Sequence, residues 1–264
     1  MKEKIVIFIF LIIFLLTLSG NNFLTPQIFA QNTDSPKTVP HACTVLVELF
    51  VQGDCLTCPT AEFCLEDLAY EYGTTQCILV QEHLWGDGYD TPETNARYNW
   101  YVGDGKRGTP DVFINGLTKR LQGLSCDCVE GNYECYKDAI DKELTRPSLL
   151  EISAVKTPHP NPLLNTIIEG TVKNISDTPL KDLAVCGMVG KEGDESGLYN
   201  YIQDIFPFQN MPPLLPGAAF SFKFIPEISL TPESEVTDKK EILHLVIFVQ
   251  NTETKEILQA LYIE

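Results

Sequence analysis

The sequence predicts an α/β domain followed by an all-β antiparallel sandwich domain. The chain has 264 residues, of which 44% are hydrophobic and 10% aromatic, and this is enough for two packed domains. Up to residue 147, short apolar runs rich in β-branched residues alternate with helical patterns. From residue 148 onward, strand-like segments follow one another with turn residues between them and no helical pattern. We therefore expect one domain over 43–147 and a second over 148–264.

The first thirty residues have the pattern of a secretion signal. Two lysines precede an almost unbroken apolar run over 5–18, and Ala30 offers a cleavage site. The run is shorter than the roughly 20 residues of a transmembrane helix, and an uncleaved N-terminal anchor is the alternative. We expect residues 1–30 to be a signal peptide and 31–42 a polar leader. The protein is then extracytoplasmic: secreted, periplasmic or on the cell surface.

The net charge of the chain argues against two classes of partner. Its 36 acidic residues outnumber its 19 basic ones, which gives a formal charge of −17. Nucleic acids and anionic membrane surfaces bind basic patches, and the sequence contains no run of lysines or arginines. We therefore expect no nucleic-acid partner.

Strands and helices alternate in the first domain. The helices are marked by apolar residues at helical spacing, by a proline in the first turn, and by a glycine or a capping residue at the ends. The expected elements are strands over 43–51 and 77–84, helices over 59–72, 91–102 and 129–144, and a hairpin over 110–123 that turns at Asn115-Gly116.

The second domain is expected to contain short strands separated by Pro, Asn, Asp and Gly. The segment Glu169–Asn174, followed by Leu180–Leu183, resembles a strand pair of bacterial immunoglobulin-like surface modules. This resemblance implies an immunoglobulin-like sandwich that positions the protein on a partner or on the cell surface. The prolines of 207–217 indicate a rigid loop. The expected strands cover 149–156, 166–173, 180–189, 219–224, 243–250 and 257–263.

A C-x-x-C pair, Cys55 and Cys58, carries the chemistry that the sequence suggests. It lies between a buried strand and the start of a helix, where residues three apart share one turn. The unpaired N–H groups and the positive end of the helix dipole favour a thiolate at Cys55. A carboxylate at Asp54 beside it opposes that negative charge. The pair is a candidate redox dithiol.

A second element, Thr109-Pro110, stands at the head of a later strand. A proline in this place is a site for a cis peptide bond, and an ordinary turn is the alternative. Proline has no N–H, so a cis-proline bond beside a dithiol leaves neighbouring backbone groups available to an incoming substrate chain.

The order of these elements over residues 42–146 resembles the thioredoxin fold. The resemblance implies that Cys55 is the attacking thiol, that Cys58 is the resolving thiol, and that Pro110, preceded by Thr109, is a substrate-binding cis-proline. With the acidic, secreted context and the sandwich that follows, the whole chain resembles extracytoplasmic thioredoxin-like proteins related to the Omp28 group of surface proteins.

The sequence departs from the thioredoxin pattern at several positions. Asp54 replaces the aromatic residue that commonly precedes the first cysteine, and Leu56-Thr57 replaces the usual Gly-Pro, so analogy does not assign the redox potential. Thioredoxins keep a buried acid that moves protons to the resolving cysteine. Glu48 is near that place, with a spacing to Cys55 that is one residue longer. Glu48 is either this proton shuttle or a strand carboxylate that faces solvent.

The remaining cysteines indicate structural disulfides, because the chain is expected outside the cytoplasm. The sequence does not choose among their pairings, although Cys126 and Cys128 are too close to pair with each other without strain. For Cys64 we expect a bridge to Cys77, and a third redox thiol is the alternative. Cys186 is expected to be a buried free thiol. The set in the first domain is Cys43, Cys64, Cys77, Cys126, Cys128 and Cys135.

Metal and cofactor sites are the weaker hypotheses. Cys55 and Cys58 with His83 suit copper or zinc, but the related copper carriers use a longer cysteine spacing, and a structural histidine is the favoured interpretation of His83. The acidic segment Gly86–Asp90 lacks the ligand spacing of a calcium loop, and we interpret it as a turn. No phosphate-binding glycine loop, G-x-S-x-G or H-E-x-x-H is present. We expect no bound cofactor and no resident metal.

Three functions follow from these features. The first is an enzyme, an extracytoplasmic thiol-disulfide oxidoreductase whose partners are protein thiols and disulfides. The second is a non-catalytic surface or secreted binding protein on a disulfide-stapled thioredoxin scaffold. The third is a copper-binding carrier. The direction of the redox chemistry, the substrate, the redox partner and the oligomeric state are not specified by the sequence.

Overall fold

The structure is a computed structural model of the chain, and it describes residues 37–38, 42–123, 129–157, 166–192, 199–226 and 243–263. The predicted signal peptide, 1–30, and most of the predicted leader, 31–42, lie outside the described residues. By its internal contacts, Thr33–Glu264 groups into one compact unit. Within the described ranges, no helix has the length and apolar character needed to cross a membrane.

The described residues contain three helices and thirteen strands. The helices are α2 (Cys58–Tyr72), α3 (Pro92–Val102) and α4 (Val129–Leu144). The strands are β1 (Lys37–Thr38), β2 (Val45–Val51), β3 (Cys77–His83), β4 (Asp111–Ile114), β5 (Lys119–Gln122), β6 (Leu150–Thr157), β7 (Ile167–Asn174), β8 (Leu183–Lys191), β9 (Tyr201–Ile205), β10 (Gln209–Asn210), β11 (Ala219–Phe224), β12 (Leu243–Asn251) and β13 (Ile257–Ile263).

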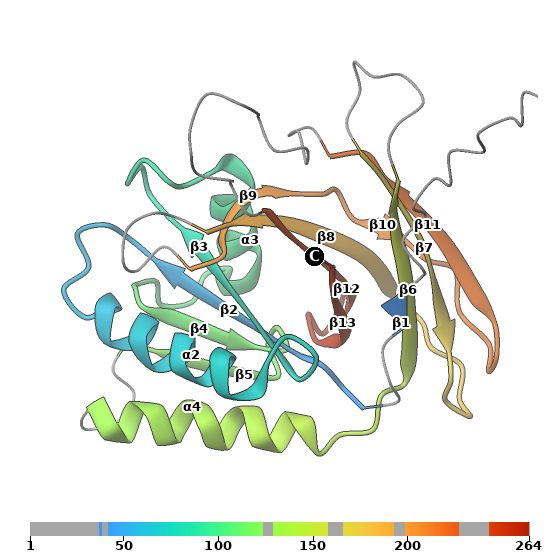
Figure 1. Cartoon of the computed structure of the whole chain (residues 1–264), viewed down its shortest axis with the longest axis horizontal. Coiled ribbons are helices and arrows are strands. Elements are labelled where there is room, and N and C mark those ends of the chain that lie inside the picture. Colours follow the sequence, from blue (N-terminus) through green and yellow to red (C-terminus); the bar gives the residue numbers. More distant parts are fainter. Residues whose placement is uncertain are drawn as a thin grey trace, which may run out of the picture. The chain divides into compact units, whose positions relative to one another are not determined.

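Most of these strands belong to one mixed sheet (Figure 1). It has nine strands, in the order β13-β12-β8-β9-β3-β2-β4-β5, with β10 attached to β8. Strand β3 runs parallel to both of its neighbours, β2 and β9, and the other pairs of this sheet are antiparallel. The sheet therefore runs without interruption from the N-terminal half of the chain into the C-terminal half.

The predicted fold class, an α/β domain with a separate sandwich, is wrong because the two halves share this sheet. Strand β9 joins them: Tyr201 pairs with Gln81 of β3, and the other side of β9 pairs with β8. The protein is mostly β, and its three described helices lie on the N-terminal part of a larger mixed sheet. The sequence analysis did not predict β9. Hydrophobic patterns identify strands, but they do not reveal pairing between segments so far apart in the chain.

A second junction joins the loop of the β4–β5 hairpin to the turn between β12 and β13. Gly116 forms a bridge with Glu256, and the N–H of Ile257 donates to the carbonyl of Asn115 at 3.0 Å. Gly116 has a φ of 66°, and a β-carbon at this position would lie 2.0 Å from the carbonyl oxygen of Lys255. Only glycine fits this close approach.

The buried strand β2 separates two cores. Its odd-numbered residues, such as Val47, pack with residues of α2 and α4 in a core that includes Cys58. Its even-numbered apolar residues point to the opposite face, where Phe50 packs with α3 and Leu46 packs with β8 and β12. This alternation is the two-residue period of a strand, and it places α2 and α4 on one face and α3 on the other (Figure 1).

A smaller sheet, in the order β1-β6-β7-β11, packs on the part of the large sheet formed by β8, β12 and β13. The shared core contains large apolar residues from both sheets, among them Ile152, Val172, Phe222, Val185 and Ile247. Two layers therefore meet as in a sandwich, but one of the layers is the large sheet itself.

The predicted helix ends agree with the structure. Helix α2 begins at Cys58 with a proline in its first turn and ends at Tyr72, followed by the cap residue Gly73, which has a φ of 71°. The side chain of Thr91 caps α3 by accepting from the N–H of Thr94 at 3.1 Å. These local signals specify the element ends because they depend on neighbouring residues only.

Candidate functional site

A disulfide joins Cys55, in the turn between β2 and α2, to Cys58, the first residue of α2, with their Cα atoms 5.4 Å apart. The two cysteines differ in exposure: Cys55 is partly exposed, whereas Cys58 is 2% exposed. Leu56 between them is 96% exposed. A reagent in solution therefore reaches the disulfide from the Cys55 side, and Cys58 is the shielded sulfur.

The turn that contains Cys55 lies at the N-terminus of α2. Thr57, the N-cap residue, makes no side-chain capping hydrogen bond, and the first turn of the helix contains no acidic residue. The Sγ atom of Cys55 lies 3.8 Å from Oγ1 of Thr57. The uncapped N–H groups and the helix dipole therefore favour negative charge on a reduced sulfur here.

The Thr109–Pro110 peptide bond is cis, as predicted. Asp111 pairs with Phe50 of β2, so Pro110 comes level with the end of β2, from which the chain leads to Cys55. Pro110 is buried and Thr109 is partly exposed. Among the described residues, no hydrogen bond uses the backbone N–H or carbonyl of Thr109. These two groups are available to a second chain.

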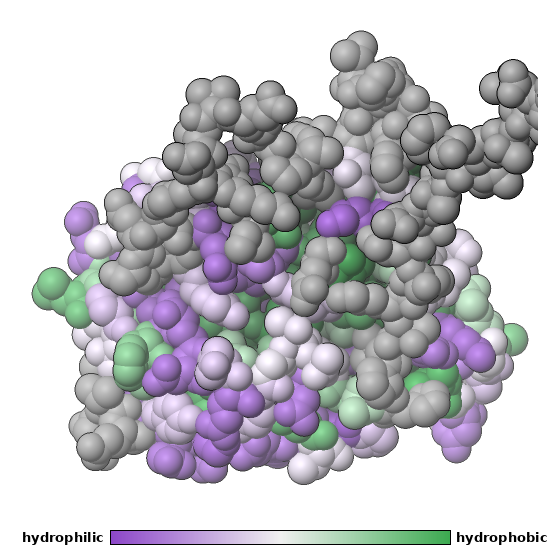
Figure 2. All heavy atoms as spheres, viewed as in Figure 1, coloured by the Kyte–Doolittle hydropathy of each residue, from purple (hydrophilic) through white to green (hydrophobic). Residues whose placement is uncertain are grey.

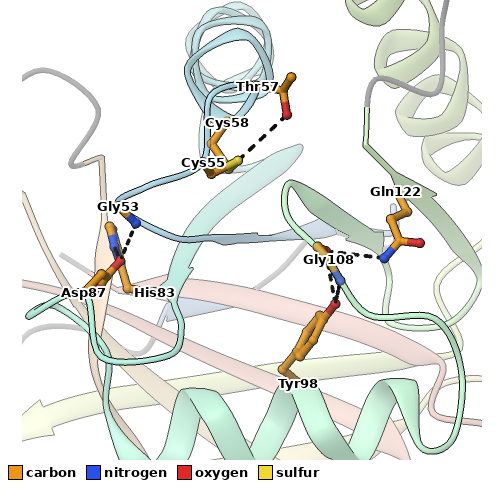
Figure 3. Close-up of a disulfide and its surroundings, with 9 residues drawn as sticks. All are labelled: Gly53, Cys55, Thr57, Cys58, His83, Asp87, Tyr98, Gly108 and Gln122. Atoms are coloured by element: carbon orange, nitrogen blue, oxygen red, sulfur yellow. Dashed lines mark hydrogen bonds and ion pairs between the residues drawn. A yellow bond between two sulfur atoms is a disulfide. The ribbon is translucent and has the colours of Figure 1, made fainter.

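Tyr98 of α3 anchors the segment before the cis bond (Figure 3). Its hydroxyl accepts from the N–H of Gly108 at 3.0 Å, and its two possible acceptors are the Gly108 carbonyl at 3.1 Å and Oδ2 of Asp111 at 2.9 Å. Nε2 of Gln122 lies 3.4 Å from the same carbonyl. Burial raises the pKa of Tyr98 to about 12, so the hydroxyl keeps its proton at neutral pH.

Asp111 fixes the chain immediately after the cis bond. Nε and Nη2 of Arg120 lie 2.9 and 2.6 Å from its two carboxylate oxygens, and the Asp111 side chain is fully buried. Burial raises the pKa of Asp111, and the hydrogen bonds from Arg120 and Tyr98 oppose that rise. Thr109 and Pro110 therefore lie between two anchored residues.

Asp87, in the loop after β3, is bonded to the loop that carries the disulfide (Figure 3). Its Oδ2 accepts from the N–H of Gly53 at 3.1 Å and lies 2.6 Å from Nδ1 of His83. His83 is 6% exposed, and its ring centroid lies 5.2 Å from that of Tyr89. These contacts agree with a structural function for His83, which holds Asp87 in place.

Glu48 does not lie beside the dithiol, and it does not face solvent. Cys58 packs with Val47 and Leu49, whereas Glu48 points to the opposite face of β2 and is fully buried. The prediction of a solvent-facing carboxylate is therefore wrong. The structure also does not bring Glu48 to Cys58 as a proton shuttle, because the one extra residue in the spacing reverses the side of the strand on which it lies.

Glu48 instead belongs to a buried ion network under α3. It pairs with Nε of Arg97 and accepts from the hydroxyl of Tyr101 at 2.6 Å. The guanidinium also lies 3.7 Å from Glu82 and 3.3 Å from Oε1 of Gln250 in β12. Burial, and then the charge of Glu48, raises the pKa of Glu82 well above its ordinary value. The raised pKa favours the neutral form of Glu82, and Glu48 is the closer acidic partner of the guanidinium.

Glu62, which the sequence analysis did not single out, lies one turn after Cys58 on α2. Burial, and then the charge of Glu66, raises its pKa to about 7. Helix α2 also carries Asp67 and Glu71 and contains no lysine or arginine. In Figure 2 hydrophilic residues cover much of the surface over α2 and α4. Ionisation of Glu62 near neutral pH therefore adds charge on the helix that begins at the dithiol.

The other cysteines agree with the prediction only in part. The predicted bridge from Cys64 to Cys77 is wrong, since Cys77 is free, whereas the buried free thiol at Cys186 is confirmed. Burial raises the pKa of Cys77 and of Cys186 to about 12, which makes both thiols unreactive. Cys135 is in a disulfide, and residues 124–128 with two further cysteines lie outside the described residues. The free, buried cysteines include Cys43, Cys77 and Cys186.

The copper hypothesis requires His83 beside the two cysteines. Its Nδ1 is hydrogen-bonded to Asp87, and the described ranges contain no group of three Cys, His, Asp or Glu side chains placed to hold a metal ion.

The acidic segment that ends at Asp90 forms bends, and Oδ2 of Asp90 accepts from Nδ2 of Asn95 at 2.8 Å. This agrees with its interpretation as a turn.

A solved structure with a similar overall fold is HBP35 of Porphyromonas gingivalis. It matches with a TM-score of 0.60 at 17% sequence identity, covering 85% of this chain and 76% of that chain. At this identity the likeness concerns the fold. Together with the cysteine pair before α2 and the cis-proline before β4, it supports a thioredoxin-like protein.

Other solved structures resemble only parts of the chain. Bacteroides uniformis beta-glucuronidase 2 reaches a TM-score of 0.30 at 19% identity, over 43% of this chain and 12% of that chain. Pseudomonas fluorescens alkylpurine DNA glycosylase AlkC reaches 0.24 at 18% identity, over 38% of this chain and 25% of that chain. Both scores are too low to indicate a shared fold. No protein-family model matches the chain, and no curated protein matches it.

Sequence reasoning missed the polar side chains that hold the site. Tyr98 lies on the buried face of the predicted helix 91–102, with Arg97 and Tyr101 beside it. A helix that buries an arginine and two tyrosines needs hydrogen-bond partners for these polar side chains. This requirement is the sequence signal from which the network could have been predicted. Asp87 gave no comparable signal, because an aspartate in a glycine-rich loop is common.

Proposed function

We propose that the protein is an extracytoplasmic thiol-disulfide oxidoreductase that acts on polypeptide disulfides or thiols. The observation that carries the proposal is the difference in exposure across the Cys55–Cys58 disulfide, next to the unpaired backbone of Thr109. The accessible sulfur suits the attacking thiol and the shielded sulfur the resolving one. A cysteine pair of this kind within a thioredoxin-like fold is compatible with thiol chemistry or with a surface protein.

In the reducing direction, the reaction uses the two sulfurs in turn. The Cys55 thiolate attacks one sulfur of the substrate disulfide, a mixed disulfide forms, and the other substrate sulfur leaves as a thiolate that takes up a proton. The Cys58 thiol then loses its proton, attacks the Cys55 sulfur and releases the second substrate thiol. The substrate gains two electrons and two protons, and the dithiol becomes the disulfide. The reverse sequence oxidises a substrate dithiol.

The extracytoplasmic location is supported by the signal-like residues 1–30 and by the number of cysteines. The finer likeness to the Omp28 group of surface proteins rests on the sequence motifs. Protein disulfides and a separate redox partner are the proposed partners.

The test is a trapping experiment combined with a redox titration. Cys58→Ser is expected to react with glutathione disulfide to give a long-lived mixed disulfide between Cys55 and one glutathione, with release of the other glutathione as a thiol, whereas Cys55→Ser is not, since the remaining sulfur is shielded. Cys186→Ser, which removes a buried thiol elsewhere, serves as the matched control and is expected to behave as the unmodified protein. Mass spectrometry identifies the modified cysteine.

The titration decides whether the disulfide is catalytic. A Cys55–Cys58 potential above about −250 mV lies in the range of redox-active disulfides, and its value assigns the direction of the reaction. A pair that stays closed below about −300 mV, or that traps nothing in Cys58→Ser, overturns the proposal.

A non-catalytic surface binding protein is the second candidate. The observation that favours it is an open groove of about 670 Å³ on the smaller sheet, lined by residues of β6, β7 and β11 that include Thr171 and Phe222. A structural potential for the Cys55–Cys58 disulfide in the same titration would favour this candidate.

A further inference from the structure

We infer that Tyr98 of α3 is a positioning residue, which fixes the backbone of Thr109 for pairing with a polypeptide substrate. The inference rests on the proposed function and deepens it. It names the residue on which a preference for a peptide disulfide over a small-molecule disulfide depends. Tyr98 acts through Gly108 and Asp111, to which it is hydrogen-bonded, and through neither cysteine.

Tyr98 is the anchor nearest to Thr109 on the N-terminal side of the cis bond. Its hydroxyl lies 3.0 Å from the N and 3.1 Å from the O of Gly108, whereas Gln122 reaches only the carbonyl, at 3.4 Å. The residues over 103–107, which lead from α3 to this point, are exposed. Arg120 holds the carbonyl of Lys106 at 2.6 Å, two residues further from Thr109. Loss of the Tyr98 hydroxyl therefore frees the backbone next to the substrate position.

On the other side of the cis bond, Asp111 loses its hydrogen bond from Tyr98 when the hydroxyl is removed, but its other contacts remain. Asp111 keeps its ion pair with Arg120 and its place in the ladder opposite Phe50. Thr109 thus presents its N–H and carbonyl from between two anchored residues. A backbone held in this way loses little conformational freedom when an extended chain pairs with it, which favours binding of polypeptides.

A small disulfide makes no use of this arrangement. It has no peptide N–H or carbonyl to pair with Thr109, and it needs only access to the exposed side of Cys55. The hydroxyl of Tyr98 should therefore change the preference between the two kinds of substrate, while the sulfur chemistry stays the same. If Tyr98 had only a structural function, its substitution would change the reaction rates with the peptide disulfide and with the small disulfide by the same factor.

The ring of Tyr98 can stay in place when its hydroxyl is removed. It packs with Phe50 at 5.0 Å, Trp85 at 5.7 Å and Phe113 at 6.5 Å between ring centroids. Phenylalanine makes the same ring contacts. Tyr98→Phe therefore removes the anchor and keeps the packing.

The experiment compares two disulfides that share one leaving group. The reduced protein reacts either with a hexapeptide whose cysteine is bonded to 2-mercaptoethanol, or with hydroxyethyl disulfide, which has no peptide bond. We expect Tyr98→Phe to lower the second-order rate constant for the peptide about tenfold and that for the small disulfide less than about twofold. The ratio of the two constants is the readout.

Two further variants control the experiment. Tyr101→Phe makes the same substitution one turn along α3, where the lost hydroxyl faces Glu48, and it should leave the ratio unchanged. Gln122→Ala removes the weaker contact to Gly108, together with contacts to Lys106 and Asp111, from an edge strand, and it should lower the ratio about twofold. Thermal unfolding confirms that each variant is folded.

The outcomes separate the inference from the proposed function. If the unmodified protein reacts with neither disulfide, the proposed function fails. If it reacts with both and Tyr98→Phe leaves the ratio unchanged, the inference is overturned and the proposed function stands. The inference is also overturned if Tyr101→Phe lowers the ratio of the two rate constants as much as Tyr98→Phe does. If Tyr98→Phe does not fold, an unchanged ratio in Gln122→Ala has the same consequence.

Discussion

On one face of β2 lies the turn with the disulfide, and on the other lies a charged network closed to water. Cys55 and Leu56 are accessible on the first side, and the hydrogen bonds there join exposed loops, such as Gly53 to Asp87. On the second side Glu48 and Arg97 are buried and tie the sheet to α3. The accessible cysteine therefore lies beyond the end of β2, and the buried charges lie on the face of the strand that α3 covers.

The difference follows from the cost of burying charge. A buried ion pair is a weak source of stability compared with apolar packing, but removal of one partner leaves a charge without compensation. An exposed loop contact loses little when it is broken, because water replaces the lost hydrogen bond. Substitutions on the two faces of β2 should therefore have different effects: a large loss of global stability on the buried face and a small local loss on the exposed face.

The largest effect is expected from Arg97→Met. This change leaves Glu48 buried without its counter-charge and should lower the free energy of unfolding by about 3–5 kcal/mol. Chemical denaturation measures the loss. The exchange rate at Cys55, measured on the folded fraction, should stay within about twofold of the unmodified value, because the network lies on the other face.

Glu82→Gln is the matched control in the same network. Burial and the charge of Glu48 raise the pKa of Glu82, which favours its neutral form, so an amide of the same shape should change stability by less than about 1 kcal/mol. A loss as large as that of Arg97→Met would contradict this expectation.

A smaller, pH-dependent effect is expected from Glu62→Gln on the dithiol face. The folded pKa of Glu62, about 7, exceeds the ordinary value of 4.5, so the folded chain holds its proton more tightly than the unfolded chain does. The stability of the unmodified protein therefore falls between about pH 4.5 and 7, and the variant avoids this loss. After allowance for partial exposure, we expect the Tm difference to grow by about 2–4 °C from pH 5 to pH 8.

Asp67→Asn, an exposed acid on the same helix, is the control for this pH effect. Its Tm difference from the unmodified protein should change less between pH 5 and pH 8 than that of Glu62→Gln, because Asp67 is exposed. An equally small change for Glu62→Gln would mean that the pKa of Glu62 is not raised.

The smallest effect is expected from Asp87→Ala. It removes the acceptor of the Gly53 N–H and the partner of His83, at a cost of about 0.5–1 kcal/mol that is confined to the loops. Hydrogen exchange at Gly53 should become several-fold faster while the global unfolding free energy stays nearly constant. A global loss comparable to that of Arg97→Met would remove the distinction between the two faces.

Local features of the fold were predictable because their causes are local. Pro59, the Thr91 cap and the Asn115-Gly116 turn act through neighbouring residues, and the corresponding helices and the hairpin have the expected ends. The side of the strand on which Glu48 lies was equally available from the sequence. Its spacing to Cys55 is one residue longer than the thioredoxin pattern, and an odd shift reverses the face of a strand.

The sequence by itself determined the strands and helices of the N-terminal half, the C-x-x-C pair before a helix and the proline at the head of a strand. Only the tertiary structure decided that β9 pairs with β3 and β8, which makes one sheet of two expected domains. It also decided that Tyr98 reaches Gly108 and that Arg97 balances Glu48. Periodicity and capping depend on neighbours along the chain, whereas strand pairing and buried polar contacts depend on which distant segments meet.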